Sequence, residues 1–269
     1  MNLNYVTKEE VLTAYKKYKS YVYYDNTNLL LRKQIAEYES DNKSVDIKLE
    51  DLYKAINSIN FIGNELFNGL DSYFLDLVKK LHYWKLPKKI ETTLDLNDQL
   101  IKNFQSVKNI KIEKYIFHVN APIEFHIISV LWIMKEGQYL VKNLENNYGY
   151  VLDKNEDNTD IVSGLRLFKP YYNEYQKWRD RSISSAKNIL NEGQNTAIIS
   201  LDLKNFYHSV KLDFNLVEKK LEKLNLKTTL TVILREIYLS YTSLLKENNE
   251  LNIYDNKSIL PIGFLSSGV

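Results

Sequence analysis

Apolar residues recur at helical spacing through most of the first hundred residues. Residues 7–10 (Thr-Lys-Glu-Glu) have the pattern of a capping box, which marks the start of a helix. An apolar stripe of period 3.6 follows this box: Val11, Tyr15, Tyr18 and Val22. Similar patterns predict helices over about 28–40 and 48–84, ended before Pro87. This part of the chain is therefore predicted to be all-α.

The middle of the chain has two further helical patterns. Pro122 opens a helix over about 123–134 that is apolar nearly all round, which predicts burial on every side. Residues 148–160 are polar and predict a surface loop. A long helix is expected after Pro170, with Gly193 as its C-terminal cap. Its apolar residues predict a buried face: Tyr172, Tyr175, Ile183, Ala186 and Leu190.

The last part of the chain begins with an apolar run of the β type. Residues 197–203 predict a short buried strand, helices are expected over 214–224 and 227–247, and residues 251–254 are a second candidate strand. Asp202 falls at the end of the first strand. Because an unpaired buried charge is very costly, this carboxylate must be hydrogen-bonded, paired or bound to a metal.

Composition restricts the chemistry. The 269 residues include no cysteine and four histidines, which excludes disulfides and thiolate sites and disfavours zinc. Carboxylates remain as ligands, and they favour a hard ion such as Mg²⁺. The 36 Lys and Arg residues nearly balance the 34 Asp and Glu residues, so net charge neither requires nor excludes a nucleic-acid partner.

The chain is predicted to be cytoplasmic, with no membrane partner. Its N-terminus lacks the basic and apolar regions of a signal peptide. The longest apolar run, residues 127–134, is too short to span a bilayer.

Two segments near the end of the chain, residues 197–210 and 260–268, are similar to motifs of reverse transcriptases. Residues 197–210 (AIISLDLKNFYHSV) resemble their first catalytic motif, and residues 260–268 (LPIGFLSSG) resemble the Pro-x-Gly-x-x-x-Ser motif that follows it. Residues 120–133, 148–152 and 168–183 resemble segments that precede the catalytic strand in bacterial defence-associated and abortive-infection-type enzymes. The resemblance extends over roughly the last 160 residues of the chain.

The resemblance implies an α+β fold belonging to a right-hand polymerase. A helix-rich N-terminal region would cover residues 1–105, fingers 106–195, and a partial palm, an antiparallel sheet backed by helices, 196–269. The implied activity is RNA-directed DNA polymerisation, adding dNTPs to a primer 3′-hydroxyl by two-metal phosphoryl transfer. An RNA template, a DNA primer or product and a non-coding RNA are candidate partners, and antiphage defence is the implied role.

The resemblance also assigns roles to residues of the first motif. Asp202 would be the first metal-binding carboxylate, and Leu203 would contribute its carbonyl oxygen to the same Mg²⁺. Tyr207, beside Phe206, would be the steric gate, because a ring under the sugar leaves no room for a 2′-hydroxyl. One aspartate is too few for two-metal chemistry, which requires several carboxylates.

In the second motif, Gly263 would let the backbone approach the nucleotide, and Ser266 or Ser267 would open a helix beside the template. Ile262 stands where many reverse transcriptases have glutamine, although an apolar residue suits the defence-associated branch. Four cations are candidate phosphate or nucleic-acid contacts: Arg166, Lys169, Arg179 and Arg181. For Arg179, an ion pair with Asp180 is an equally favoured interpretation.

The sequence departs from the family in one major respect. No Tyr-x-Asp-Asp motif follows Gly263, and residues 254–256 (Tyr-Asp-Asn) precede the glycine motif and have a single acid. The 269-residue chain alone is therefore expected to be an inactive fragment of an active parent.

Three other hypotheses stay open. The first is a polymerase of the same fold that works without a template or from a protein primer. The second is a non-catalytic module that binds single-stranded RNA through aromatic and basic side chains. The third is a helical scaffold without nucleic acid. Taken singly, an Asp after a strand is most often a helix cap, paired aromatics are often core, and Pro-Ile-Gly is often a turn.

Overall fold

The computed structural model describes residues 5–25, 28–59, 61–62, 65–66, 72–90, 112–141, 147–157, 160–162, 164–203, 206–250 and 257–269. Its α-helices are α1 (Lys8–Tyr24), α2 (Leu29–Ser40), α3 (Val45–Ser58), α4 (Ser72–Val78), α5 (Ile123–Lys135), α6 (Tyr171–Asn191), α7 (Phe206–Ser209), α8 (Phe214–Glu222) and α9 (Thr229–Glu247). Short 3-10 helices are η3 (Gly137–Tyr139) and η4 (Leu265–Gly268). Strands β1 (Phe61–Ile62) and β2 (Glu65–Leu66) form one antiparallel pair, and β3 (His82–Ile90) and β4 (Ile112–Asn120) form another. The fold is helix-rich α+β, as predicted, but the described residues of 196–269 contain no paired strand, so the antiparallel sheet expected there is not formed by them.

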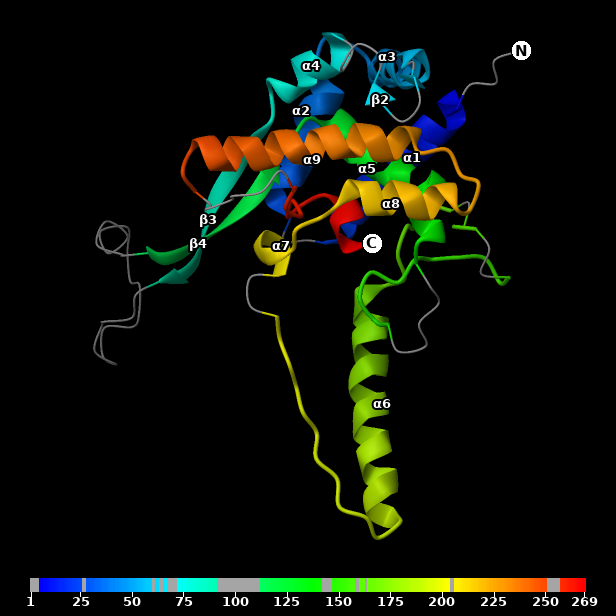
Figure 1. The fold of residues 1–269 in the computed structure, drawn as a ribbon, viewed down its shortest axis with the longest axis vertical. Helices are drawn as coiled ribbons and strands as arrows, with labels where there is room; N and C mark the ends of the chain where they lie inside the picture. The colour runs from blue at the N-terminus through cyan, green and yellow to red at the C-terminus, as the bar shows by residue number, and fades with distance from the viewer. Residues whose placement is uncertain are drawn as a thin grey trace.

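Helix α5 lies at the centre of the hydrophobic core, packed against α1, α9 and η4 (Figure 1). Ten of its residues are buried, from Ile123 to Ile133, which confirms the helix predicted to be buried on every side. The core runs from Val6 to Leu265 and draws on all three of the regions predicted from the sequence. The boundaries of those regions stay a prediction.

Helix α1 begins as its sequence predicts. The hydroxyl of Thr7 accepts a hydrogen bond from the Glu10 amide at 3.1 Å, and the Glu10 carboxylate accepts one from the Thr7 amide at 2.7 Å. The apolar stripe is buried, with Val11, Tyr18 and Val22 fully enclosed. Helices α2, α8 and α9 also form where apolar periodicity predicts them.

The prediction that the first hundred residues are all-α is wrong at residues 61–62, 65–66 and 82–90, and the helix predicted over 48–84 is divided into α3 and α4. Residues 82–90 form strand β3, and Pro87 lies inside it, paired with Tyr115 of β4. β3 belongs to a two-stranded sheet, so Pro87, which has no N–H, can face the unpaired edge, and a register shift follows it. Aromatic residues at 82–84 (His-Tyr-Trp) suit a strand better than the helix first expected.

A buried carboxylate joins the N-terminal segment, α5 and α9. Glu136, directly after α5, is fully enclosed and accepts hydrogen bonds from the amides of Leu230 and Thr231, both at 2.8 Å. It also accepts from the hydroxyls of Tyr5 and Thr231. Burial raises the pKa of Glu136, while these donors act in the opposite direction. The carboxylate thus caps the first turn of α9, where the N-cap Thr228 makes no side-chain hydrogen bond.

Helix α6 projects away from the rest of the molecule, and residues 194–203 return beside it as an extended chain (Figure 1). The helix and its C-terminal glycine are confirmed: Gly193 has φ +78° and donates to the Leu190 carbonyl at 3.0 Å. The predicted burial of its apolar face is wrong, because Tyr172, Tyr175 and Ile183 are exposed. The 3.6 period identifies an apolar face but does not supply a surface to cover it.

Residues 251–254, the second candidate strand, lie outside the described part of the chain. None of the helices that the structure describes is both long enough and apolar enough to cross a membrane.

Candidate functional site

The glycine of the second motif lies against strand β4. Gly263 has φ +116°, a conformation that residues with a Cβ rarely adopt. A Cβ at this position would overlap the imidazole of His118, whose Nδ1 would be only 2.8 Å away. The neighbouring Ile262 accepts a hydrogen bond from the Val119 amide at 2.8 Å. Close approach and backbone conformation therefore both require glycine here.

Both serines of this motif are buried in a network of hydroxyl groups. The Ser266 amide donates to the Ser129 hydroxyl at 2.9 Å, and the hydroxyl of Tyr238 lies 2.8 and 2.9 Å from those of Ser266 and Ser267. Ser267 donates to the Pro261 carbonyl at 2.7 Å. These contacts anchor η4 between α5 and α9, so both serine hydroxyls are already engaged within the core.

The first motif continues directly alongside the second. Phe206 and Tyr207 begin α7, and the Leu260 amide donates to the Tyr207 carbonyl at 3.1 Å. Nearby, the Leu212 amide donates to the Ser258 carbonyl at 2.7 Å. Phe206 is exposed, whereas Tyr207 is half-buried. The structure thus brings Phe206 and Tyr207 next to the residues that lead into the glycine motif.

Tyr150 also belongs to this cluster, although the sequence assigned it no role. Its ring lies against Gly268, where a Cβ would come within 2.6 Å of it, and packs edge-to-face on Phe168 with ring centroids 5.3 Å apart. Burial raises the pKa of Tyr207 to about 12, and the phenol of Tyr150 acts in the same direction. Residues 148–152 resemble a family segment, but nothing in their sequence indicates contact with Gly268.

The predicted buried strand at 197–203 does not form. These residues are extended but make no strand pairing, and Leu201 is 89% exposed. No described segment offers its backbone groups to this one, and a strand requires such a neighbour for its hydrogen bonds. Asp202 and Leu203 are accordingly exposed, which corrects the expectation of a buried carboxylate.

A magnesium site is not assembled around Asp202 in this part of the chain. Within the described ranges, no group of three or more His, Cys, Asp or Glu side chains could hold a metal ion. One carboxylate and one backbone carbonyl, from Leu203, are an incomplete donor set for Mg²⁺. The residues present therefore do not fit a two-metal centre by themselves.

The four candidate cations have different surroundings. Arg166 is paired with Asp153 at 3.1 Å, and Arg179 with Asp180 at 2.8 Å, which confirms the ion-pair interpretation for Arg179. Arg181 donates to the hydroxyl of Tyr148 at 3.2 Å, and the backbone of Lys169 pairs with Val151. Arg179 and Arg181 lie on the projecting α6 and Arg166 and Lys169 on the segment before it. Each arginine would have to exchange its present contact to bind a phosphate.

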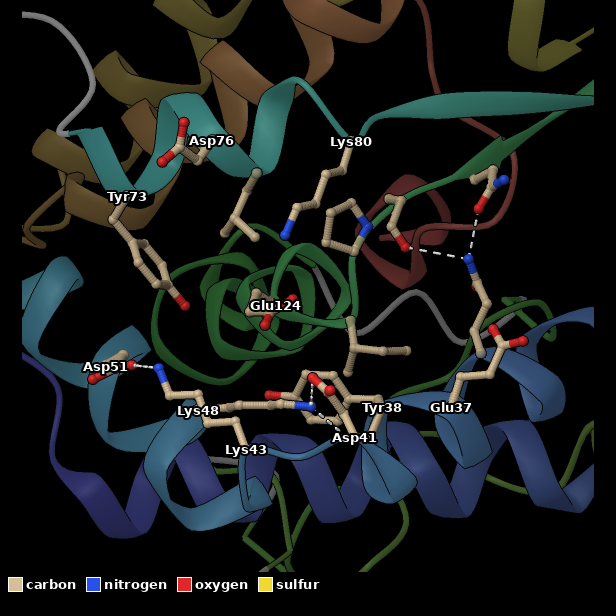
Figure 2. A pocket seen from close by; sticks show the side chains of 16 residues that line it. Glu37, Tyr38, Asp41, Lys43, Lys48, Asp51, Tyr73, Asp76, Lys80 and Glu124 are labelled. Atoms are coloured by element: carbon tan, nitrogen blue, oxygen red, sulfur yellow. Dashed lines mark hydrogen bonds and ion pairs between the residues drawn. The ribbon is translucent and has the colours of Figure 1, made fainter.

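A separate hollow of about 500 Å³ lies at the N-terminal end of α5, between α2, α3 and α4 (Figure 2). Glu124 lies at its centre, and Lys80 points toward it from the side of α4. Burial raises the pKa of the Glu124 carboxyl. Lys48 is paired with Asp41 at 3.0 Å, and Lys43 with Asp51. Nothing in the sequence drew attention to this hollow.

Searches for similar proteins found no matching family model, no matching curated protein and no matching solved structure.

Proposed function

We propose that this chain forms the fingers and the first part of the palm of an RNA-directed DNA polymerase. The observation that carries the proposal is the contact between the two motifs that resemble reverse transcriptases, where the Leu260 amide bonds the Tyr207 carbonyl. These motifs are separated in sequence by α8 and α9, yet their backbones pair. A deoxynucleoside triphosphate would bind where α7 and the Gly263 turn meet.

In this proposal, each residue has a limited task. The ring of Tyr207 would lie under the sugar and exclude a 2′-hydroxyl, and the missing Cβ of Gly263 keeps the turn close to β4. Asp202 would supply one carboxylate for metal binding. When bound, Mg²⁺ would supply charge neutralisation at the phosphates. The implied setting is cytoplasmic antiphage defence, with an RNA template and a DNA primer as partners.

Primer extension by the product of the complete gene tests this proposal. The protein should add dNTPs to a primer annealed to RNA, and Asp202→Asn should reduce this activity at least 100-fold while the thermal midpoint is unchanged, because the side chain is exposed. Asp157→Asn, an exposed acid in the 147–157 loop, is the matched control and should retain full activity. Failure to incorporate any dNTP, with every template tried or with none, would refute the proposal.

A second function, binding of single-stranded RNA, is favoured by the exposed aromatic side chains of α6. The rings of Tyr171 and Tyr175 have centroids 6.1 Å apart, and those of Tyr175 and Trp178 5.6 Å apart. All three side chains are exposed along one face, and Lys187 lies on the same helix. Stacking on such rings contributes about 1–3 kcal/mol per base without sequence preference.

Fluorescence titration with an unstructured RNA at several salt concentrations distinguishes this function. Trp178→Ala should weaken binding about tenfold, and binding should fall as salt rises. Tyr24→Ala, which removes an exposed ring from α1, is the control and should bind as tightly as the unmodified chain. If the Trp178→Ala variant binds RNA as tightly as the unmodified chain, α6 is not an RNA-binding surface, whatever the outcome of primer extension.

A further inference from the structure

The hollow at the N-terminal end of α5 has many charged side chains in its lining, and most of them are already paired. The ion pairs join Asp41 to Lys48, Asp51 to Lys43, Asp76 to Lys79 and Glu37 to Lys33. Glu124 and Lys80 are the exceptions. Lys80 points toward Glu124 (Figure 2), but within the described residues neither side chain makes an ion pair. One carboxylate and one ammonium of the hollow therefore remain free to bind a ligand.

Two uncharged polar side chains in the lining of the hollow also lack a partner. Tyr38 is 9% exposed, and its hydroxyl is buried without a hydrogen bond to any described residue. The side-chain oxygen of Gln34 is in the same state, although the amide nitrogen donates to the Asn120 side chain at 2.6 Å. Buried polar atoms without partners are rare in native proteins, because each one has given up its hydrogen bonds to water. Two such atoms in the lining of one hollow indicate that it is suited to a ligand with hydrogen-bonding groups.

The helix and the apolar side chains around the hollow complete its chemistry. The N-cap residue of α5, Pro122, makes no side-chain hydrogen bond, and the partial positive charge of a helix N-terminus attracts carboxylates. Leu77 and Ile123 form an apolar part of the lining, and Tyr73 extends toward Glu124 (Figure 2). The volume of about 500 Å³ is typical of small-molecule sites. The hollow thus offers a negative group, a positive end and an apolar wall.

We propose that this hollow binds a free α-amino acid, whose ammonium pairs with Glu124 and whose carboxylate pairs with Lys80 and the N-terminal end of α5. A simple anion would leave the carboxylate of Glu124 unpaired, and a simple amine would leave the ammonium of Lys80 unpaired. Only a zwitterion satisfies both, with a charge-assisted hydrogen bond at each end. A metal ion fits less well, because the described residues hold no group of three acids or histidines suited to one.

This site is separate from the segments that resemble polymerase motifs. None of the residues that line the hollow belongs to 197–210 or 260–268. Binding of an amino acid therefore does not depend on the proposed polymerase activity, and the 269-residue chain itself can be used to measure it.

The first experiment asks whether both charges of the amino acid are needed. The thermal midpoint of the chain is measured with each of the common amino acids in turn, and the one that raises it most is titrated by calorimetry. We expect a dissociation constant below about 1 mM. The corresponding amine, without the carboxylate, and the corresponding acid, without the ammonium, should each bind at least about tenfold more weakly. The proposal is overturned if no amino acid raises the midpoint, or if the amine or the acid alone binds as tightly.

Substitutions in the lining locate the site. Glu124→Gln and Lys80→Met should each weaken binding about tenfold, since each removes one charge-assisted bond. Glu37→Gln is the matched control, because this carboxylate also lines the hollow but is exposed and paired with Lys33 at 3.6 Å, and its loss should leave the affinity unchanged. Unchanged affinity in both Glu124→Gln and Lys80→Met would overturn the proposal.

A hydroxyl deletion separates binding from folding. The Tyr38 hydroxyl has no hydrogen bond in the described chain, so Tyr38→Phe should not lower the thermal midpoint of the free chain. The same variant should bind the amino acid about fivefold more weakly, the effect of one lost hydrogen bond to the ligand. A lower midpoint with unchanged affinity would show that the hydroxyl serves the fold and not a ligand, which would count against the site.

Discussion

The two segments that resemble polymerase motifs have opposite environments. Residues 258–268 lie within the core, where Ser266 and Ser267 are hydrogen-bonded and Gly263 touches β4. Residues 197–203 are extended, exposed and without strand pairing. A segment whose side chains fill the core is fixed by that core, whereas a strand depends on a neighbour for its backbone hydrogen bonds. Equal resemblance in sequence therefore does not mean equal anchoring in the fold.

The largest expected effect on stability comes from adding a side chain at Gly263, where a Cβ would overlap His118. Gly263→Ala should lower the free energy of unfolding of the 269-residue chain by about 3 kcal/mol, because a Cβ meets His118 and the backbone has φ +116°. Urea denaturation measures this change. In Gly149→Ala, the new Cβ meets nothing within 4 Å, so the loss should stay below about 1 kcal/mol. Equal losses at both positions would show that Gly263 is not tightly packed.

The second-largest expected effect is a loss of stability at acidic pH caused by His126, which packs beside the same motif. His126 is fully buried between Tyr18 and Phe264, and neither ring nitrogen has a partner. Burial lowers its pKa to about 3. The imidazole of His126 takes up a proton near pH 6.5 in the unfolded chain but only near pH 3 in the folded chain. The free energy of unfolding therefore falls as the pH drops from 6.5 toward 3.

Lowering the pH from 7 to 5 should reduce the free energy of unfolding by about 2 kcal/mol, because the unfolded chain takes up this proton and the folded chain does not. His126→Leu should remove most of that loss, as measured by urea denaturation at the two pH values. His82→Gln, at an exposed histidine of β3, should leave the pH dependence intact. If His126→Leu is as acid-sensitive as the unmodified chain, the histidine is not buried as described.

How much of the fold could be predicted from the sequence depended on what each residue pattern reports. Apolar periodicity located α1, α5 and α9 because a helix satisfies its own backbone, and its stripe shows which face is buried. It failed for residues 82–90, where the strand depends on pairing with β4, far along the chain. It also failed for the burial of Tyr175, since the pattern shows an apolar face but not what covers it.

For the candidate site, the sequence supplied the motifs but not their contacts. The pairing of Leu260 with Tyr207 could be expected only through the family resemblance. The position of Tyr150 depends on a positive φ and on ring contacts with Phe168 and Gly268, and no local pattern encodes either. The Glu136 cap on α9 was missed for the same reason, as its partners lie about a hundred residues downstream.

The third effect is the loss of one hydroxyl from the serine network. Tyr238→Phe should destabilise the chain by about 1–2 kcal/mol, because the buried hydroxyls of Ser266 and Ser267 each lose a partner. Tyr172→Phe, on the exposed face of α6, should change stability by less than about 0.5 kcal/mol. Thermal unfolding with both variants in parallel measures the difference, and a neutral Tyr238 variant would contradict the network.

The smallest expected effect tests the exposed segment directly. Ile199 is 79% exposed, so Ile199→Ala removes few contacts and should change the free energy of unfolding by less than about 0.5 kcal/mol. Ile259, in the buried segment, is 3% exposed, and Ile259→Ala should cost about 2–4 kcal/mol through lost burial and the cavity left behind. The same Ile→Ala substitution thus compares the contributions of residues 197–203 and 258–268 to stability. A loss above 1 kcal/mol at Ile199 would show that residues 197–203 pack against the folded chain, and the contrast between the two motifs would then disappear.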